Sequence, residues 1–210
     1  MKRTILTILF IIGVAHLYAQ KNPIYLLNDF TQGTVLMKNG SKAVALLNYD
    51  ACNRLMKYKE KDDIMILTNT QQVDTIFISS HKFIPANRSF LEIIDMPNGK
   101  AYINWSLKET YKGKIGAYGQ TTQSSTTTTI NTSYYNKGIY KNENRDVIGT
   151  YNDNDYWFYL NNKFVKFKNE KSLLKLFPQK EEAIRNYIKE YKTDMKNPKQ
   201  VIELMNYCLE

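Results

Sequence analysis

Hydrophobic and polar residues alternate in short segments over most of the chain, and this two-residue period predicts β-strands. Residues that favour tight turns separate the segments. Asn39-Gly40 and Asn161-Asn162 are pairs typical of β-hairpins, because glycine and asparagine tolerate the positive φ that such turns require. Strands spaced this evenly predict an antiparallel sheet that curves into a half-barrel or a sandwich-like meander.

A helical period replaces the alternation in the last part of the chain. Hydrophobic residues from Ile184 to Tyr191 recur at intervals of three and four, which places them on one face of a helix. Asn197 and Pro198 suit the cap and the first turn of a final helix. The whole pattern predicts an α+β fold, in which two or three C-terminal amphipathic helices pack on the curved antiparallel β-sheet.

The pattern divides the chain into three parts. Residues 1–19 form an export leader, residues 20–168 form the sheet domain, and residues 169–210 form the helical segment. Residues 111–154 interrupt the sheet domain with a stretch rich in glycine and threonine that has no sustained period. We interpret this long low-complexity excursion as two strands with a mobile tip.

The leader is predicted from the order of its residues. Lys2 and Arg3 form a basic start, a hydrophobic run follows, and Ala19 supplies the small residue that precedes cleavage of a signal peptide. The hydrophobic run is shorter than the ~20 residues that a transmembrane helix needs. We therefore expect an exported protein without a transmembrane segment in its mature chain.

Charge and histidine content restrict the function classes. The chain has 29 Lys and Arg against 20 Asp and Glu, and loss of Lys2 and Arg3 with the leader lowers the formal net charge from +9 to +7. The surplus is dispersed, so we expect no nucleic-acid partner, while a basic polyanion-binding protein stays an alternative. Because His81 is the only histidine outside the leader, sites built from several histidines are excluded, and we expect no metal and no cofactor.

Aromatic residues near the excursion predict a binding surface. Aromatic rings stack on sugar rings and on bases, so such residues at the surface are typical of a ligand platform. The alternative is that one face of the strand at 156–160 belongs to the core. The candidate binding residues are Trp105, Tyr118, Tyr156, Trp157 and Tyr159.

No motif in the sequence predicts catalysis, and we assign no catalytic residue. Two serines precede His81, but no Gly-x-Ser-x-Gly sequence accompanies them. Glu92, Asp95 and Glu109 are carboxylates that an acid and base pair would need. A hydrolase that acts on envelope polymers through His81 or these carboxylates is therefore the alternative to a binding protein.

The two cysteines, Cys52 and Cys208, leave two alternatives open. An exported chain meets an oxidising compartment, where the pair can form a disulfide. The other alternative is two independent buried thiols, because free cysteine is among the most buried residue types.

Several segments resemble a known group of proteins. They are the leader ending in Ala19-Gln20, and residues 47–50, 116–132, 172–180 and 187–190. With these segments the chain resembles uncharacterised exported β-rich proteins of Bacteroidota. The resemblance implies an envelope location, in the periplasm or at the outer membrane rather than outside the cell. It brings no activity and no site residue.

Asp74-Thr75-Ile76 resembles the O-glycosylation pattern of the same phylum, and this resemblance implies modification of Thr75. The alternative is an ordinary threonine in a strand. Taken together, the sequence predicts a non-catalytic binding or scaffolding protein of the bacterial cell envelope, whose partner is an envelope component or a glycan. It predicts neither the ligand nor the oligomeric state.

Overall fold

The computed structural model describes residues 24–115, 121–122 and 146–210, so the predicted leader at 1–19 lies outside the described residues. The strands are β1 (Thr31–Met37), β2 (Lys42–Asp50), β3 (Leu55–Glu60), β4 (Asp63–Ile66), β5 (Val73–Ile78), β6 (His81–Ala86), β7 (Ser89–Met96), β8 (Gly99–Asn104), β9 (Leu107–Ile115), β10 (Thr121–Thr122), β11 (Asp146–Asn152), β12 (Asp155–Leu160) and β13 (Lys163–Phe167). The helices are α1 (Glu170–Leu174), α2 (Glu181–Glu190) and α3 (Pro198–Leu209), with 3₁₀ turns η1 (Thr70–Gln72) and η2 (Pro178–Lys180).

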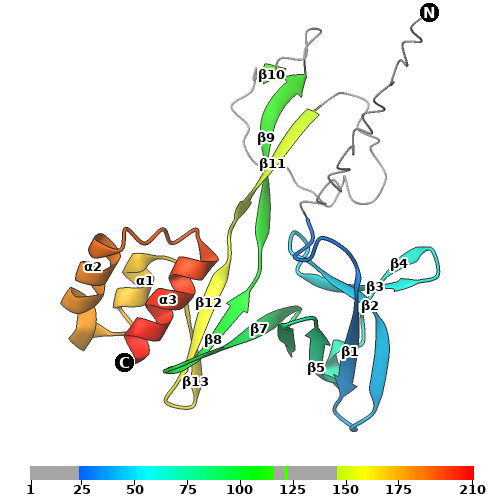
Figure 1. Ribbon diagram of the computed structural model, residues 1–210, viewed down its shortest axis with the longest axis horizontal. Helices are drawn as coiled ribbons and strands as arrows, with labels where there is room; N and C mark the ends of the chain where they lie inside the picture. The colour runs from blue at the N-terminus through cyan, green and yellow to red at the C-terminus, as the bar shows by residue number, and fades with distance from the viewer. Residues whose placement is uncertain (1–23, 116–120, 123–145) are drawn as a thin grey trace, which may run out of the picture.

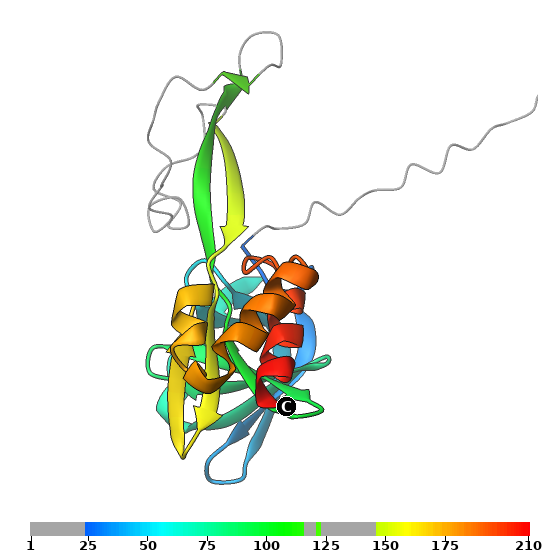
Figure 2. The same ribbon diagram turned by 90° about the vertical axis from the view of Figure 1, so that its left-hand side faces the viewer.

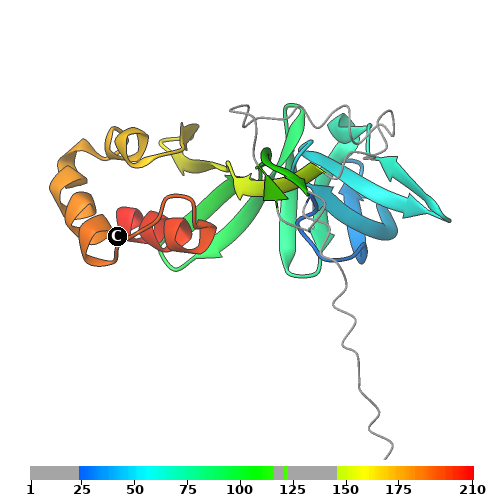
Figure 3. The same ribbon diagram turned by 90° about the horizontal axis from the view of Figure 1, so that it is seen from above.

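Ten of the strands form one open, antiparallel, curved sheet. Their order is β13-β12-β8-β7-β6-β5-β1-β2-β3-β4, and β10, β9 and β11 form a separate three-stranded sheet. The helices lie together at one end of the molecule, beside β8, β12 and β13, and β1 to β4 lie at the other end (Figures 1 and 3). The α+β fold with a curved antiparallel sheet and C-terminal helices is confirmed.

The two predicted hairpins form where the turn residues require them. Gly40 has φ +84° between β1 and β2, a conformation that costs glycine nothing. Asn161 and Asn162 have φ +48° and +60° and join β12 to β13, whose last pair is Leu160 with Lys163. Two successive residues with positive φ match the twist of the flanking strands, which fixes the hairpin register.

The hydrophobic core consists of two clusters. One lies inside the curved half of the sheet and includes Tyr49, Met56 and Phe83, and the other lies between the sheet and the helices and includes Phe158 and Leu204. The helix side of the second cluster comes from the predicted stripe of α3. Val201, Leu204, Met205 and Cys208 are all buried there.

Trp105 packs against both clusters, just after the end of β8. The indole therefore joins the curved half of the sheet to the half that the helices cover. A residue in this position supports the fold, and the prediction that Trp105 also belongs to a ligand platform stays a prediction.

The excursion forms an arm. β9 pairs with β11 from Leu107 opposite Asn152 to Lys114 opposite Asp146. β9 therefore begins before residue 111, β11 lies within the predicted excursion, and the two strands form the described part of the arm. Figures 1 and 2 both show these strands leading away from the rest of the molecule. Residues 116–120 and 123–145, including the predicted mobile tip and Tyr118, lie outside the described residues.

Candidate ligand-binding cleft

The alternation of β12 decides which of its side chains reach the surface. Tyr156 and Phe158 are buried and face the helix-covered cluster. Successive residues of a strand point to opposite faces, so Asp155, Trp157 and Tyr159 lie on the face away from the helices. This second face is called the outer face below, and it extends over β13, β12, β8, β7 and β6.

Aromatic side chains gather on the outer face. Tyr159 is 50% exposed and Phe164 is 46% exposed, which is high for side chains of this size. The Phe164 ring lies 5.0 Å from the Tyr159 ring and 5.0 Å from the Tyr102 ring. Trp157 lies on the same face of β12 as Tyr159, two residues away. The outer face thus presents adjacent rings on hydrogen-bonded strands.

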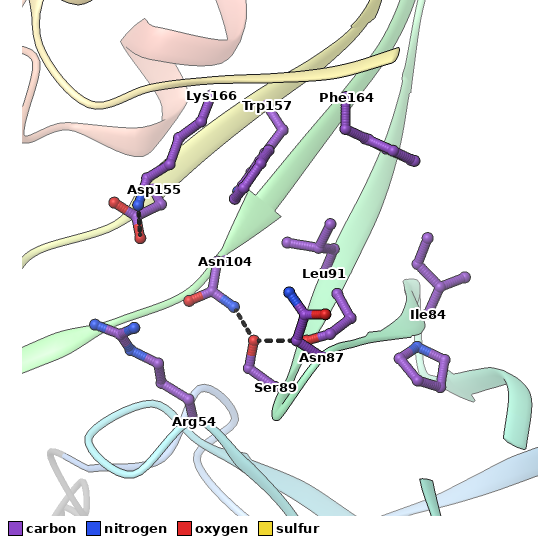
Figure 4. Close-up of a pocket in the computed structure, with 12 residues that line it drawn as sticks. Arg54, Ile84, Asn87, Ser89, Leu91, Asn104, Asp155, Trp157, Phe164 and Lys166 are labelled. Atoms are coloured by element: carbon purple, nitrogen blue, oxygen red, sulfur yellow. Dashed lines mark hydrogen bonds and ion pairs between the residues drawn. The ribbon is translucent and has the colours of Figure 1, made fainter. Parts of the chain in front are cut away.

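A cleft of about 520 Å³ lies beside these rings. Figure 4 shows Arg54, Asp155 and Lys166 toward one side of the cleft and Ile84 and Phe164 toward the other. Besides these five, the lining residues are Pro85, Ala86, Asn87, Ser89, Leu91, Asn104 and Trp157. The cleft therefore has a charged side, a hydrophobic side and aromatic rings along one wall.

Hydrogen bonds fix the polar wall of the cleft. The side-chain amide of Asn104 donates to Ser89 Oγ at 2.8 Å and to the Phe90 carbonyl at 3.0 Å. Ser89 Oγ donates in turn to the Ala86 carbonyl at 3.3 Å. Because Asn104 and Ser89 lie on strands and are already bonded to the protein, this wall is rigid before any ligand arrives.

The charged side is organised around a buried carboxylate. Asp155 is 6% exposed, and its Oδ2 lies 2.8 Å from Lys166 Nζ. Asp155 Oδ1 lies 3.7 Å from Lys168 Nζ and accepts no hydrogen bond within the described residues. Lys166 Nζ also lies 5.6 Å from the centre of the Trp157 ring, so the lysine holds the carboxylate and the indole together.

Arg54 reaches the cleft from a different part of the chain. It occupies the turn between β2 and β3 with φ +59°, and its Nε donates to Ser106 Oγ at 3.3 Å. The turn is held by Asp50, whose carboxylate accepts from the Asn53 backbone N–H at 2.9 Å and from the Asn53 amide at 2.8 Å. Asp50 therefore positions the residue before Arg54.

The five predicted binding residues fall in different places. Trp157 lines the cleft, and Tyr159 lies beside it on the outer face. Tyr156 is 1% exposed and belongs to the core, because the strand period turns it toward the helices. The prediction that Tyr156 binds a ligand is therefore replaced by the core alternative. Trp105 packs against both clusters and, half-buried, lines a second cleft of about 450 Å³. Tyr118 lies outside the described residues.

Sequence reasoning missed the charged residues of the cleft. Lys166 follows from the hairpin, because Asn161-Asn162 pairs Trp157 with Lys166 in register. The position of Lys166 opposite Trp157 could therefore have been predicted from the sequence. Arg54 was not predictable, since it meets β12 only through the curvature of the whole sheet.

His81 and Glu92 form a second polar group, on the opposite face of the sheet. His81 Nδ1 lies 2.6 Å from Glu92 Oε1, and Trp105 Nε1 donates to Glu92 Oε2. Glu92 is buried and His81 is half-buried. The carboxylate thus holds an imidazole and an indole, the arrangement by which a carboxylate orients a catalytic histidine. Within the described residues, no serine or cysteine bonds to His81.

The other predicted carboxylates do not join this group. Asp95 has a side chain that is 74% exposed, and it lies 3.5 Å from Lys100. Burial and the nearby charge of Asp50 raise the pKa of Glu109, which lies on β9. Glu92 pairs with His81 and not with Asp95 or Glu109. Among these three predicted carboxylates, the structure therefore shows no acid and base pair of the kind that a hydrolase needs.

The His81–Glu92 pair predicts a pH-dependent stability. The hydrogen bond with Glu92 raises the pKa of His81 above 6.5, and burial offsets this only in part. The His81–Glu92 pair therefore stabilises the folded protein fully below pH about 6.5, the pKa of histidine in the unfolded chain. This contribution is lost as the pH rises through the raised pKa of the folded state. We expect the free energy of unfolding, measured with urea between pH 6 and 8 on protein without the leader, to fall with pH.

Glu92→Gln removes this fall, because it leaves His81 without its ionic partner. His81 is the only histidine outside the leader, so few other groups titrate in this range. A wild-type slope equal to that of the Glu92→Gln variant would contradict the prediction.

The cysteines do not form the disulfide that was one of two alternatives. Cys208 is buried among the helices, whereas Cys52 lies partly exposed in the turn after β2, and both thiols are free. Burial raises the pKa of Cys52 and of Cys208 to about 12, and the charges of Glu109 and Asp50 add to the effect at Cys52.

These thiols are expected to be unreactive in the folded protein, because the thiolate is the nucleophile. A colorimetric disulfide reagent at pH 8 should react slowly with native protein. After unfolding in guanidinium without a reductant, it should report two thiols per chain. If the unfolded protein shows no free thiols, Cys52 and Cys208 form a disulfide and the prediction is wrong.

Thr75 lies on β5 and is 7% exposed, and its hydroxyl donates to Asp74 Oδ2 at 2.8 Å. The folded protein therefore does not present this hydroxyl to a glycosyltransferase. O-glycosylation of Thr75 stays a prediction for the chain before it folds.

Three further observations bear on function. Across the described ranges, no three His, Cys, Asp or Glu side chains come close enough to hold a metal ion. None of the described helices has the length and hydrophobicity to cross a membrane. Comparison of the chain with protein-family models, with curated proteins and with solved structures finds no match. The class is therefore defined by the structure itself: an α+β protein whose open sheet has helices on one face and an aromatic, charged cleft on the other.

Proposed function

We propose that the protein is a non-catalytic binding protein of the bacterial cell envelope, and that it binds a glycan in the cleft on the outer face. The observation that carries the proposal is the position of Trp157 in a preformed cleft, beside the exposed rings of Tyr159 and Phe164. Exposed aromatic groups next to a cleft are not needed for the fold. They are typical of a surface that binds another molecule.

The chemistry of the cleft supports a sugar ring. Aromatic faces stack on rings, while hydroxyl groups need polar partners at the edge. Trp157 supplies the face, and Asn87 and Lys166 supply polar groups along the same cleft. The walls are strands bonded to one another, so little conformational entropy is lost when a ligand binds.

The envelope location is part of the proposal: the predicted leader at 1–19 supports export, and the resemblance to exported proteins of Bacteroidota supports the envelope. A glycan ligand agrees with that location, because envelope polymers are rich in sugars.

The two tryptophans allow a direct test. In Trp105→Phe protein, the fluorescence comes from Trp157 alone, and we expect it to change in a saturable way when trigalacturonate or its neutral methyl ester is added. Trp157→Ala should weaken binding of a sugar by about tenfold, measured by calorimetry, because stacking on one aromatic ring contributes ~1–3 kcal/mol.

Trp157→Phe protein is the matched control, since its fluorescence comes from Trp105, which lies outside the cleft. The Trp105 signal should not respond to either sugar. If neither sugar changes the fluorescence of Trp157 and calorimetry detects no binding, the glycan proposal is wrong.

Hydrolysis of an envelope polymer is a second candidate, favoured by the bond between His81 and Glu92. It predicts the release of reducing ends from polygalacturonate, and loss of that activity in His81→Ala protein that still folds. Binding without any release of reducing ends supports the non-catalytic proposal.

A further inference from the structure

The cleft contains a cation that forms no ion pair among the residues that the structure describes. Arg54 is half-buried, and Ser106 Oγ is the one partner that its guanidinium bonds within the described residues. In that part of the chain, none of the ion pairs includes Arg54. A guanidinium has five donors in a planar fork that matches a carboxylate or a phosphate. Its free donors are therefore available to an anion.

A second cation lies on the same side of the cleft. Figure 4 shows Lys166 above Asp155 and Arg54 below it, all three on the charged side. Lys166 pairs with Asp155, so the three groups together carry a net charge of +1. Lys168 lies 3.7 Å from Asp155 Oδ1, but its Nζ pairs with Asp153 Oδ2 at 2.8 Å and it does not line the cleft, so it leaves this balance unchanged. The electrostatic balance of the cleft therefore favours an anionic group over a neutral or cationic one.

The ring-binding wall and the anion-binding groups are adjacent. Lys166 pairs with Trp157 across β12 and β13, and its Nζ lies 5.6 Å from the indole ring. A ligand whose ring lies on Trp157 therefore places a ring substituent near Lys166. Arg54 then approaches from the turn between β2 and β3, on the same side of the cleft.

We infer that the ligand is an acidic glycan, with the carboxylate of a uronic acid held by Arg54 and Lys166 and its ring stacked on Trp157. This inference rests on the proposed glycan-binding function and specifies the ligand. Arg54 is the group that distinguishes an acidic sugar from a neutral one, because among the described residues its guanidinium bonds only Ser106 Oγ and has donors left for a carboxylate.

The experiment compares two ligands that differ only in charge: trigalacturonate and its neutral methyl ester. Calorimetry with full-length mature protein should show tighter binding of the acid. Arg54→Gln should weaken binding of the acid by about tenfold or more and leave binding of the ester unchanged, because a hydrogen bond to a charged group contributes ~1.5–3 kcal/mol. Arg54→Lys should restore part of the loss.

Arg88→Gln is the matched control. Arg88 is an exposed arginine in the turn between β6 and β7, and it does not line the cleft, so its substitution changes the net charge equally without removing the fork. Circular dichroism establishes that each variant folds. A variant that does not fold is replaced by Lys166→Met, which removes the second cation and should weaken binding of the acid in the same way.

The outcomes separate this inference from the proposed function. Equal binding of acid and ester, or equal effects of Arg54→Gln and Arg88→Gln, overturns the acidic ligand while the glycan proposal stands. Failure of both sugars to bind overturns the glycan proposal itself. Inorganic phosphate should not displace trigalacturonate at an equal concentration. If it does, the site binds a free anion or a phosphate group, and the uronic acid is wrong.

Discussion

Asp50→Ala is expected to lower the free energy of unfolding by about 3–5 kcal/mol, because it removes one partner of a buried ion pair. Asp50 is fully buried, and its Oδ2 lies 2.7 Å from Lys57 Nζ. Burial alone lowers the pKa of Lys57, but the hydrogen bond and the charge of Asp50 outweigh burial and raise it. Without Asp50, the half-buried ammonium group of Lys57 loses its ion-pair partner and keeps its contact with the Tyr25 ring, whose centre lies 5.4 Å from Nζ. Urea denaturation followed by circular dichroism measures the change.

Asp95→Ala is the matched control, since Asp95 and Lys100 form an exposed pair at 3.5 Å. An exposed pair contributes ~0–1 kcal/mol, so this variant should unfold near the wild-type denaturant concentration. Replacing both residues, as in Asp50→Ala with Lys57→Met, should recover part of the stability. Equal midpoints for Asp50→Ala and Asp95→Ala would show that the buried pair does not stabilise the fold.

The Asp50 variant also has a functional consequence. Asp50 accepts two hydrogen bonds from Asn53, and Arg54 follows Asn53 in the same turn. Loss of the carboxylate frees a turn whose next residue has positive φ, a conformation that is costly for arginine. A variant that still folds is therefore expected to bind the acidic sugar more weakly.

Local features of the sequence explain how much of the fold was predictable. The Asn161-Asn162 hairpin and the α3 helix depend on neighbouring residues, namely two asparagines with positive φ and the Asn197 cap that accepts from the Lys199 N–H. Both were predicted correctly. Alternation also showed that β12 has two faces, but period alone does not say which face the helices cover. Trp157 and Tyr156 were therefore predicted together, although one reaches the cleft and the other reaches the core.

The remaining part of the site depends on contacts between distant residues. Arg54 and Lys166 are 112 positions apart, and they line one cleft because ten strands curve between two cores. The packing of Trp105 against both clusters could not be predicted for the same reason. The Trp105 indole donates to Glu92 and packs against both clusters. These contacts join residues that are distant in the sequence, so no local pattern identifies them.

Phe158→Ala is expected to destabilise the protein by about 3–5 kcal/mol, since it leaves a cavity where the helices meet the sheet. Phe158 is fully buried, with ring centres 5.3 Å from Phe167 and 5.1 Å from Phe177. Phe167 lies on β13, and Phe177 lies just before η2, so this ring connects the sheet to the helical segment. Thermal unfolding and urea denaturation should both show the loss, and hydrogen exchange should increase first in α2 and α3.

Tyr159→Ala is the control on the same strand. Tyr159 lies on the outer face, and its ring contact with Phe164 is a cross-strand pair that contributes ~0.2–1 kcal/mol. The two adjacent substitutions thus remove rings of similar size from opposite faces of β12. Equal destabilisation by both would mean that the outer face is covered in the native protein, and the cleft beside Trp157 would then be closed to a ligand. A large loss for Phe158→Ala alone identifies the outer rings as dispensable for folding and available for binding.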